Sequence, residues 1–289
     1  HHSFSGAARA LGTVQSNVSA HVRRLEDELG VTLIERSTTE PTPEGAAVLE
    51  RARRIESEFS SLDSDLAYLR DVVVGSVRLG GIGTTARWLV PPLLRLLWDR
   101  YPEVRAVVLD APSSALVLGT EGGTVDLAVI NLPVDHPDIE VQTLFTEDRM
   151  VIAPEGHPLA ERDEVPLAEL AEHELLLEAP GTAFRDVLDS AAAEAGVELR
   201  ARAEFDGMRL LASLAFAGFG AGVVPASAVS IGTEGPWRAV PIADVPRRTV
   251  GLIRRRRGLP SAAARVVAEV LGDAVREGCV SVPGIEAAS

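Results

Sequence analysis

Residues 3–31 read SFSGAARALGTVQSNVSAHVRRLEDELGV, which is the pattern of two short helices joined by a tight turn. The first amphipathic segment covers residues 4–11, Gly12-Thr13 breaks it, and the second covers residues 15–29. The apolar positions of the second segment recur at helical spacing and are Val18, Val22, Leu25 and Leu29. This arrangement predicts a helix-turn-helix, whose second helix enters the major groove of DNA. Two helices that merely pack together give the same pattern, so the spacing alone leaves both interpretations open.

The polar face of the second predicted helix carries side chains that can bind nucleic acid. Gln and Asn can bind adenine through two hydrogen bonds, while Ser and Arg can reach base edges or phosphates. We therefore expect the DNA contacts to be made by Gln15, Ser16, Asn17, Ser19, His21, Arg23 and Arg24. The formal net charge of −14 argues against a nucleic-acid partner, but the acidic excess lies beyond residues 1–36, which are neutral.

Residues 42–71 have the pattern of one long helix. Thr42 suits the N-cap and Pro43 the first helical position, where the missing N–H of a proline costs nothing. The apolar residues alternate between spacings of four and three, which is a heptad seam, and they are Val48, Ala52, Ile55, Phe59, Leu62, Leu66 and Leu69. We expect the seam to pair with a second copy of the chain as a coiled coil; packing on the chain's own core is the alternative.

The composition limits the class of protein. Of the 289 residues, 46% are hydrophobic and 24% charged, which is typical of a globular protein with more than one domain. No apolar run approaches the roughly 20 residues of a membrane span, and residues 1–5 lack the features of a secretory signal. The single cysteine, Cys279, excludes an internal disulfide and a two-cysteine redox switch, and it suits a reducing cytoplasm, the expected location.

Signals for an enzyme or a cofactor are absent from the sequence. It contains no nucleophile elbow, P-loop or dinucleotide fingerprint, and its histidines lack metal-ligand spacing. We expect no catalytic residues, no metal and no cofactor. The arginine run at 254–257 could be a nucleic-acid patch, but its place between an apolar strand and Gly258 favours a solvated loop.

From about residue 73 onwards, strand and helix patterns alternate, which predicts an α/β fold with largely parallel sheets. Residues 106–109 and 127–130 have the pattern of buried parallel strands. Thr84 and Thr85 follow a strand and open a helix, where free N–H groups favour an anion, although either could simply be an N-cap.

Two further segments extend this predicted ligand site. Asn131 would lie at the carboxyl edge of the sheet, where open α/β sheets bind ligands. Residues 181–184 open a second helix that could face the first across a cleft.

Several stretches, in this order and spacing, resemble the LysR-type transcriptional regulators over nearly the whole chain. They are SFSGAARAL (3–11), VQSNVS (14–19), RLEDELGV (24–31), LIER (33–36), TPEG (42–45), GTVDLAV (123–129), HPLA (157–160) and AGFGAGVVP (217–225).

The resemblance implies an all-α winged helix-turn-helix with a long linker helix, followed by a two-lobed α/β effector domain like the type 2 periplasmic binding proteins. The expected domains are residues 1–41, a truncated DNA-binding domain; 42–72, the linker helix; 73–148 with 247–278, and 149–246, the two effector subdomains; and 279–289, a tail. It also implies binding to promoter DNA, a small-molecule effector between the lobes (a carboxylate or another small metabolite), assembly as a homodimer or homotetramer, and RNA polymerase as a further partner.

With the resemblance added, the expected effector-binding residues are Ile82, Thr84, Thr85, Asn131, Gly181, Thr182, Ala183, Phe184 and Val223. Ile82 stands where the family often has a hydroxyl, which suggests a less polar effector. Two other departures concern DNA. The family's first helix is expected to be missing, and Ala20 and residues 37–41 lack basic side chains common there. This stretch of chain by itself is therefore expected to bind DNA weakly or not at all, which is not expected of the intact protein. A plain solute-binding protein and an enzyme on a two-lobed scaffold are the rival functions.

Overall fold

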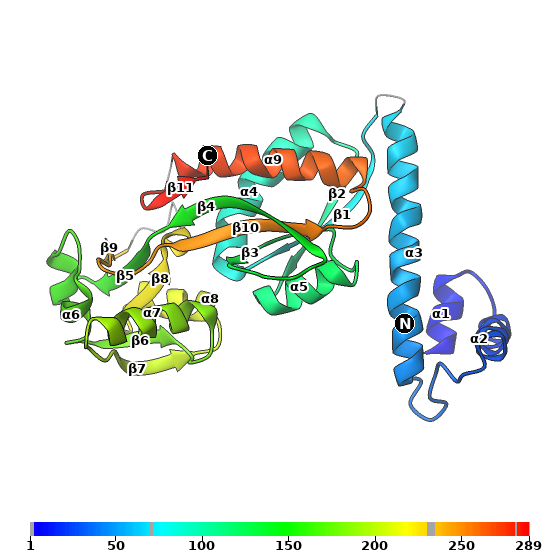
Figure 1. Ribbon diagram of the computed structural model, residues 1–289, viewed down its shortest axis with the longest axis horizontal. Coiled ribbons are helices and arrows are strands. Elements are labelled where there is room, and N and C mark those ends of the chain that lie inside the picture. The colour runs from blue at the N-terminus through cyan, green and yellow to red at the C-terminus, as the bar shows by residue number, and fades with distance from the viewer. Residues whose placement is uncertain (1–2, 70–71, 230–234, 281, 289) are drawn as a thin grey trace. The chain divides into compact units, whose positions relative to one another are not determined.

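The computed structural model describes residues 3–69, 72–229, 235–280 and 282–288 (Figure 1). Contacts within the chain divide it into two compact units, residues 1–59 and residues 60–289. The long helix α3 (Pro43–Tyr68) begins in the first unit and ends in the second.

The first unit contains the two short helices that the sequence predicts, α1 (Phe4–Ala10) and α2 (Gln15–Leu29). The Ser3 hydroxyl caps α1 by accepting from the Gly6 N–H at 3.0 Å. Gly12 and Gly30 take left-handed φ angles of 63° and 70°, which a glycine adopts without a steric penalty, and these residues end α1 and α2. After α2, a short bridge pairs Ile34 with Pro41 in the place of the wing.

The start of α3 follows the predicted capping. The Thr42 hydroxyl accepts from the Gly45 N–H at 2.9 Å and donates to the Thr32 carbonyl at 2.6 Å. A Cβ on Gly45 would lie 1.9 Å from the Leu33 carbonyl oxygen, so only glycine fits where the chain before α3 crosses its first turn.

The first lobe of the second unit is built on a sheet that, in the described part of the chain, has the strand order β11-β4-β10-β3-β1-β2. Its strands are β1 (Gly75–Gly81), β2 (Val104–Asp110), β3 (Leu127–Leu132), β4 (Ile139–Glu147), β10 (Arg248–Arg255) and β11 (Ile285–Ala287). Its helices are α4 (Gly83–Arg100), α5 (Ser113–Glu121) and α9 (Ala262–Cys279).

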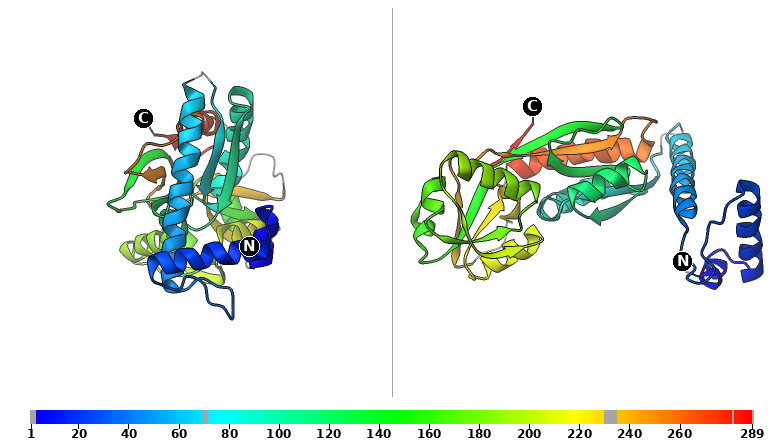
Figure 2. Two further views of the ribbon diagram at one scale, coloured as in Figure 1. Left: turned by 90° about the vertical axis from the view of Figure 1, so that its right-hand side faces the viewer. Right: turned by 60° about the horizontal axis from the view of Figure 1, so that its bottom comes forward.

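The second lobe has its own sheet, which over the described residues has the order β7-β6-β8-β5-β9. Its strands are β5 (Arg149–Pro154), β6 (Glu174–Glu178), β7 (Arg200–Phe205), β8 (Ala221–Pro225) and β9 (Trp237–Pro241). The helical elements are η1 (Pro158–Glu161), α6 (Leu167–Leu170), α7 (Ala183–Glu194), α8 (Met208–Phe216) and η2 (Ala226–Ala228). The chain crosses between lobes from β4 to β5 and from β9 to β10, as Figure 2 allows the reader to follow.

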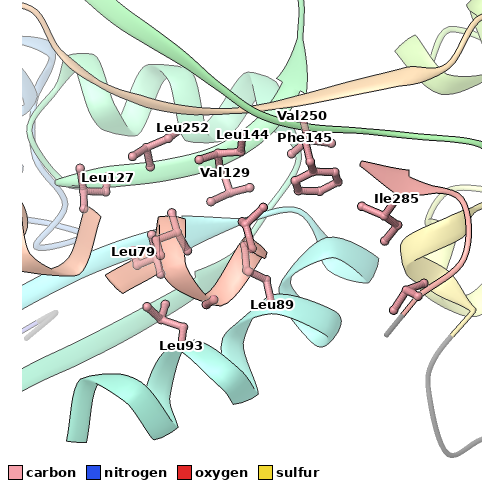
Figure 3. Packing of buried hydrophobic residues seen from close by; sticks show 14 of the residues in the cluster. Leu79, Leu89, Leu93, Leu127, Val129, Leu144, Phe145, Val250, Leu252 and Ile285 are labelled. Atoms are coloured by element: carbon pink, nitrogen blue, oxygen red, sulfur yellow. The ribbon is translucent and has the colours of Figure 1, made fainter. Parts of the chain in front are cut away.

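Strand β3 explains why the first lobe has helices on both faces of its sheet. Successive side chains of a strand point to opposite faces. Leu127 and Val129 join the core under α4 and α9, whereas Ala128 and Ile130 join a second cluster under α5. Figure 3 shows Leu79, Leu89 and Leu93 packed in the larger cluster, where each fully buried leucine contributes about 2 kcal/mol.

Three expectations about the effector domain were wrong. Strand β2 pairs in parallel with β1 but lies at the sheet edge, so Val107 and Leu109 are each 36% exposed rather than buried. The sheets are mixed rather than largely parallel, because β10 runs antiparallel to β3 and β4, and β5 runs antiparallel to β8 and β9. Residues 279–289 are not a simple tail, because β11 pairs with β4.

Candidate effector cleft and DNA-binding helix

A cleft of about 800 Å³ lies between the two lobes of the second unit. Its walls are the carboxyl ends of strands from both sheets and the segments that follow them, as expected for ligand sites of open α/β sheets. Its lining includes Gly83, Asp110, Asn131, Glu178, Asp206, Arg209 and Arg248.

Four helix N-termini meet at this cleft, those of α4, α5, α7 and α8. Thr182 caps α7 by accepting from the Arg185 N–H at 3.2 Å. In the described part of the chain, no side chain caps α4, α5 or α8, whose N-cap positions hold Ile82, Pro112 and Gly207. First-turn N–H groups have no acceptor within their own helix, so these three ends present hydrogen-bond donors and positive potential to a ligand.

Arg248 forms the polar floor of the cleft. It is 7% exposed, and its Nη2 lies 2.7 Å from Oε1 of Glu147, which is fully buried. The same Nη2 donates to the Thr85 hydroxyl at 2.6 Å. Arg248 Nε and Asn131 Oδ1 are both buried, and neither has a hydrogen-bond partner among the described residues. Two residues of the cleft lining therefore carry a buried polar atom that has no protein partner among the described residues.

Arg149 holds the second wall. It is 3% exposed, stacks over the Phe184 ring at 4.2 Å, and donates to the Phe184 carbonyl at 3.3 Å and the Pro246 carbonyl at 3.0 Å. Burial, together with the nearby positive charge of Arg248, lowers the pKa of Arg149 to about 10, so it remains a cation at neutral pH. Arg149 thereby joins the first turn of α7, at Phe184, to Pro246 in the crossover between β9 and β10.

Carboxylates line the cleft as well. Glu178 ends β6, Asp206 follows the adjacent parallel strand β7, and Asp110 ends β2. Burial raises the pKa of Glu178 above its ordinary value, and the negative charge of Asp206 adds a smaller rise. The Thr182 hydroxyl, which donates to Glu178 at 3.0 Å, and the positive charges of Arg248 and Arg149 oppose the rise. Part of the cleft therefore disfavours a second negative charge.

Helix α2 presents the predicted DNA-contacting residues to solvent. Gln15, Ser16, Asn17, His21, Arg23 and Arg24 are exposed and Ser19 is half-buried. Some of them also make contacts within the unit: Gln15 Oε1 accepts from the Ser5 hydroxyl, Asn17 Nδ2 donates to the Thr13 hydroxyl, and Arg24 pairs with Glu28 at 2.9 Å. The N-terminal turn of α2 is thus polar, accessible and held against α1.

The heptad seam along α3 is exposed over most of its length. Val48 is half-buried and Ala52 exposed, while Ile55, Phe59, Leu62, Leu66 and Leu69 are 58%, 66%, 53%, 51% and 80% exposed. Such a continuous apolar face marks an interaction surface rather than a monomer surface.

The comparisons with known proteins assign the family. Residues 1–46 match the family model described as bacterial regulatory helix-turn-helix protein, lysR family, and residues 70–276 match the LysR substrate binding domain. The chain belongs to the LysR-type transcriptional regulators. It is accordingly a DNA-binding transcriptional regulator with an effector-binding domain, and not an enzyme.

Relatives and solved structures cover nearly the whole regulator. A probable hydrogen peroxide-inducible genes activator of Streptomyces viridosporus is 32% identical over 283 residues, which are 96% of this chain and 91% of the relative. Full-length OxyR of Pseudomonas aeruginosa is 26% identical with a TM-score of 0.73, covering 95% of this chain and 90% of that one. Full-length CbnR in complex with its target DNA is 26% identical with a TM-score of 0.70, covering 95% and 94%.

The structure places most of the predicted effector residues of this regulator on the cleft wall. These are Ile82, Thr84, Asn131, Gly181, Thr182, Ala183 and Phe184. Thr85 is fully buried and bonded to Arg248, and Val223 lies in the core of the second lobe, so neither lines the cleft. Neither Thr84 nor Thr85 is an N-cap, because α4 begins after Ile82.

The charged residues of the cleft are not among the residues that the sequence predicts to bind the effector. Asp110, Glu178 and Asp206 could have been found as polar residues at the ends of strands, the signal that identified Asn131. Arg248 and Arg209 carry no such signal. Arg248 is placed by the crossover into β10, and Arg209 is placed by its contacts with Gly83 and Asp110 of the other lobe. The run at 254–257 is largely paired, for example Arg254 with Glu140 at 2.6 Å.

Two classes of site find no support in the structure. The described residues hold no group of three or more His, Cys, Asp or Glu side chains that could bind a metal ion. Within the same residues, no helix combines the length and apolarity that a membrane span needs.

Glu178→Gln should stabilise this regulator at neutral pH. The pKa of Glu178 is higher in the folded than in the unfolded chain, so its ionised form costs folding free energy above the folded pKa, and a neutral amide does not. By differential scanning fluorimetry, the melting temperature of the variant should exceed that of the wild type at about pH 8. The gain should shrink as the pH falls and vanish below the ordinary glutamate pKa of about 4.3, where both side chains are neutral.

Glu174→Gln, at the exposed opposite end of β6, is the matched control and should show no such gain. A Glu178→Gln variant that melts below the wild type at about pH 8 would contradict the cost of burying this carboxylate.

Proposed function

We propose that the effector is a small organic anion, most simply a carboxylate, held at the uncapped N-termini of the cleft. The observation that carries this proposal is the convergence of three uncapped helix ends, those of α4, α5 and α8, on a cleft that the buried Arg248 also lines. Helix N-termini bind anions through oriented N–H groups and the helix dipole. The carboxylates Glu178 and Asp206 favour an effector whose far end carries hydroxyl or amine donors rather than a second negative charge.

Thiol oxidation is the second candidate signal, because several relatives are named as hydrogen peroxide-inducible activators. Cys279 is the single cysteine of the 289 residues, so no disulfide can form within this chain. Burial, and the nearby negative charge of Glu147, raise the pKa of the Cys279 thiol. A reactive cysteine needs a depressed pKa, so its surroundings support a cleft ligand over a thiol switch.

Promoter recognition by the exposed face of α2 is the second part of the proposal. The exposed N-terminal turn, with Gln15, Ser16 and Asn17, is the part of a recognition helix that reaches base edges. Arg23 and Arg24 supply charge for phosphates. We further propose that the regulator acts in the cytoplasm as a dimer or tetramer and alters the access of RNA polymerase to the promoter.

Asn17→Ala tests the DNA-reading face. Fluorescence anisotropy with the promoter region upstream of the regulator's own gene should show about a 5- to 150-fold loss of affinity, the cost of one good base contact, and little change for unrelated DNA. Arg24→Ala is the control: it should weaken binding to both DNAs about equally, because phosphate contacts carry no sequence information. An Asn17→Ala variant that keeps the wild-type preference for the promoter would remove α2 from sequence recognition.

Cys279→Ser, measured in parallel with and without hydrogen peroxide, should leave promoter binding unchanged.

Leu62→Asp tests pairing through α3. Leu62 is 53% exposed at the middle of the seam, and a carboxylate there would be buried in a coiled-coil interface at a cost of several kcal/mol. Sedimentation analysis should show that the variant loses the dimer at concentrations where the wild type and Arg53→Ala, on another exposed face, remain paired. An unchanged dimer in Leu62→Asp would place the interface elsewhere.

A further inference from the structure

An ion pair spans the mouth of the cleft. Arg209, in the first turn of α8, belongs to the second lobe, and Asp110, the last residue of β2, belongs to the first. Arg209 Nη1 lies 2.5 Å from Asp110 Oδ2. The two side chains are 64% and 33% exposed, so the pair is accessible to dissolved ligands and to salt.

The stem of Arg209 lies over the first residue of α4. A Cβ built on Gly83 would be 3.1 Å from Arg209 Cγ and 3.3 Å from its Cδ, so the missing side chain of Gly83 leaves the space that Arg209 occupies. Arg209 is therefore held at the uncapped end of α4 by Gly83 on one side and by Asp110 on the other.

The two arginines of the cleft differ in how exposed they are and in how many protein partners they already have. Arg248 is 7% exposed and is committed to Glu147 and the Thr85 hydroxyl. Arg209 is 64% exposed and has a single acidic partner, Asp110, within the described cleft. An anion that arrives at the N-terminus of α4 thus meets an accessible guanidinium whose present partner is a weakly held surface carboxylate.

We propose that Arg209 is the specificity-determining residue that reads the negative charge of the effector, and that Asp110 is its internal competitor. This inference rests on the proposed anionic effector. A carboxylate at the N-terminus of α4 takes the guanidinium of Arg209 from Asp110 and accepts the bidentate hydrogen bonds that arginine gives to carboxylates. The ligand then joins the first turns of α4 and α8, which lie on different lobes. Asp110 sets the effector concentration at which this exchange occurs.

Trifluoroacetate, followed by ¹⁹F NMR in the full-length protein at constant ionic strength, is a minimal carboxylate probe, and trifluoroethanol is its uncharged counterpart. The wild type should bind trifluoroacetate more tightly than trifluoroethanol. Asp110→Asn should tighten trifluoroacetate binding about twofold to fivefold, the strength of an exposed ion pair. Arg209→Gln should weaken it about tenfold, the loss of a charged hydrogen bond. The double variant should bind like Arg209→Gln, because the gain from Asp110→Asn requires a free Arg209.

Asp206→Asn is the matched control, because it removes an equal charge from the same cleft but is not paired with Arg209. Its effect should be small and the same with and without Arg209. If Asp110→Asn tightens binding equally in the Arg209→Gln background, or if Arg209→Gln binds trifluoroacetate like the wild type, Arg209 is not the reader. If no variant prefers trifluoroacetate to trifluoroethanol, the anionic effector itself is refuted together with the role of Arg209.

Discussion

The buried ion pair between Glu147 and Arg248 is the interaction on which the effector domain depends. Glu147 ends β4 and Arg248 begins β10, so the pair joins the two places where the chain passes between lobes. Two charges removed from water need partners, and here the ion pair itself supplies them, because Glu147 Oε1 makes no hydrogen bond among the described residues. Glu147 also accepts from the Ser227 N–H at 2.6 Å, and Arg248 donates to Thr85 in the first turn of α4. One charged cluster thus fixes both crossovers to the cleft.

From this cluster, packed helices lead to the linker. Helix α4 opens at the cleft and packs along α9, with Arg95 paired to Glu277 at 2.6 Å and Trp88 against Gly278. At its other end, α9 donates from the Ala262 N–H to Asp65 at 2.9 Å and from the Ala263 N–H to Ser64 at 3.2 Å, both on the last turns of α3. The cleft and the end of the linker helix are therefore connected through rigid elements, which is the kind of contiguous contact that coupling between sites requires.

The sequence predicts what depends on local periodicity and capping. Helix α2 occupies the predicted residues 15–29, α3 begins at the predicted cap Thr42, and most predicted cleft residues lie at strand ends or helix starts. The sequence does not predict features that depend on which strands pair over long distances in the chain. Nothing in residues 106–109 reveals that β2 is an edge strand, because edge position depends on which strands pair. Val223 belongs to a stretch that resembles the family's effector domain, but its side chain lies in the core of the second lobe. The positions of Arg248 and Arg209 in the cleft follow only from the three-dimensional fold.

Occupation of the cleft by the effector is expected to change promoter binding. The most direct test is the affinity of the full-length regulator for its own promoter DNA, by fluorescence anisotropy at fixed salt, with and without a pool of cellular metabolites. The test compares the wild type with Ser114→Trp, which places a bulky ring at the exposed start of α5 on the cleft wall. The wild-type affinity should change at least about fivefold, the usual lower range of allosteric coupling, and the affinity of the filled variant should not change. An equal response in both proteins would contradict the claim that the effector acts through this cleft.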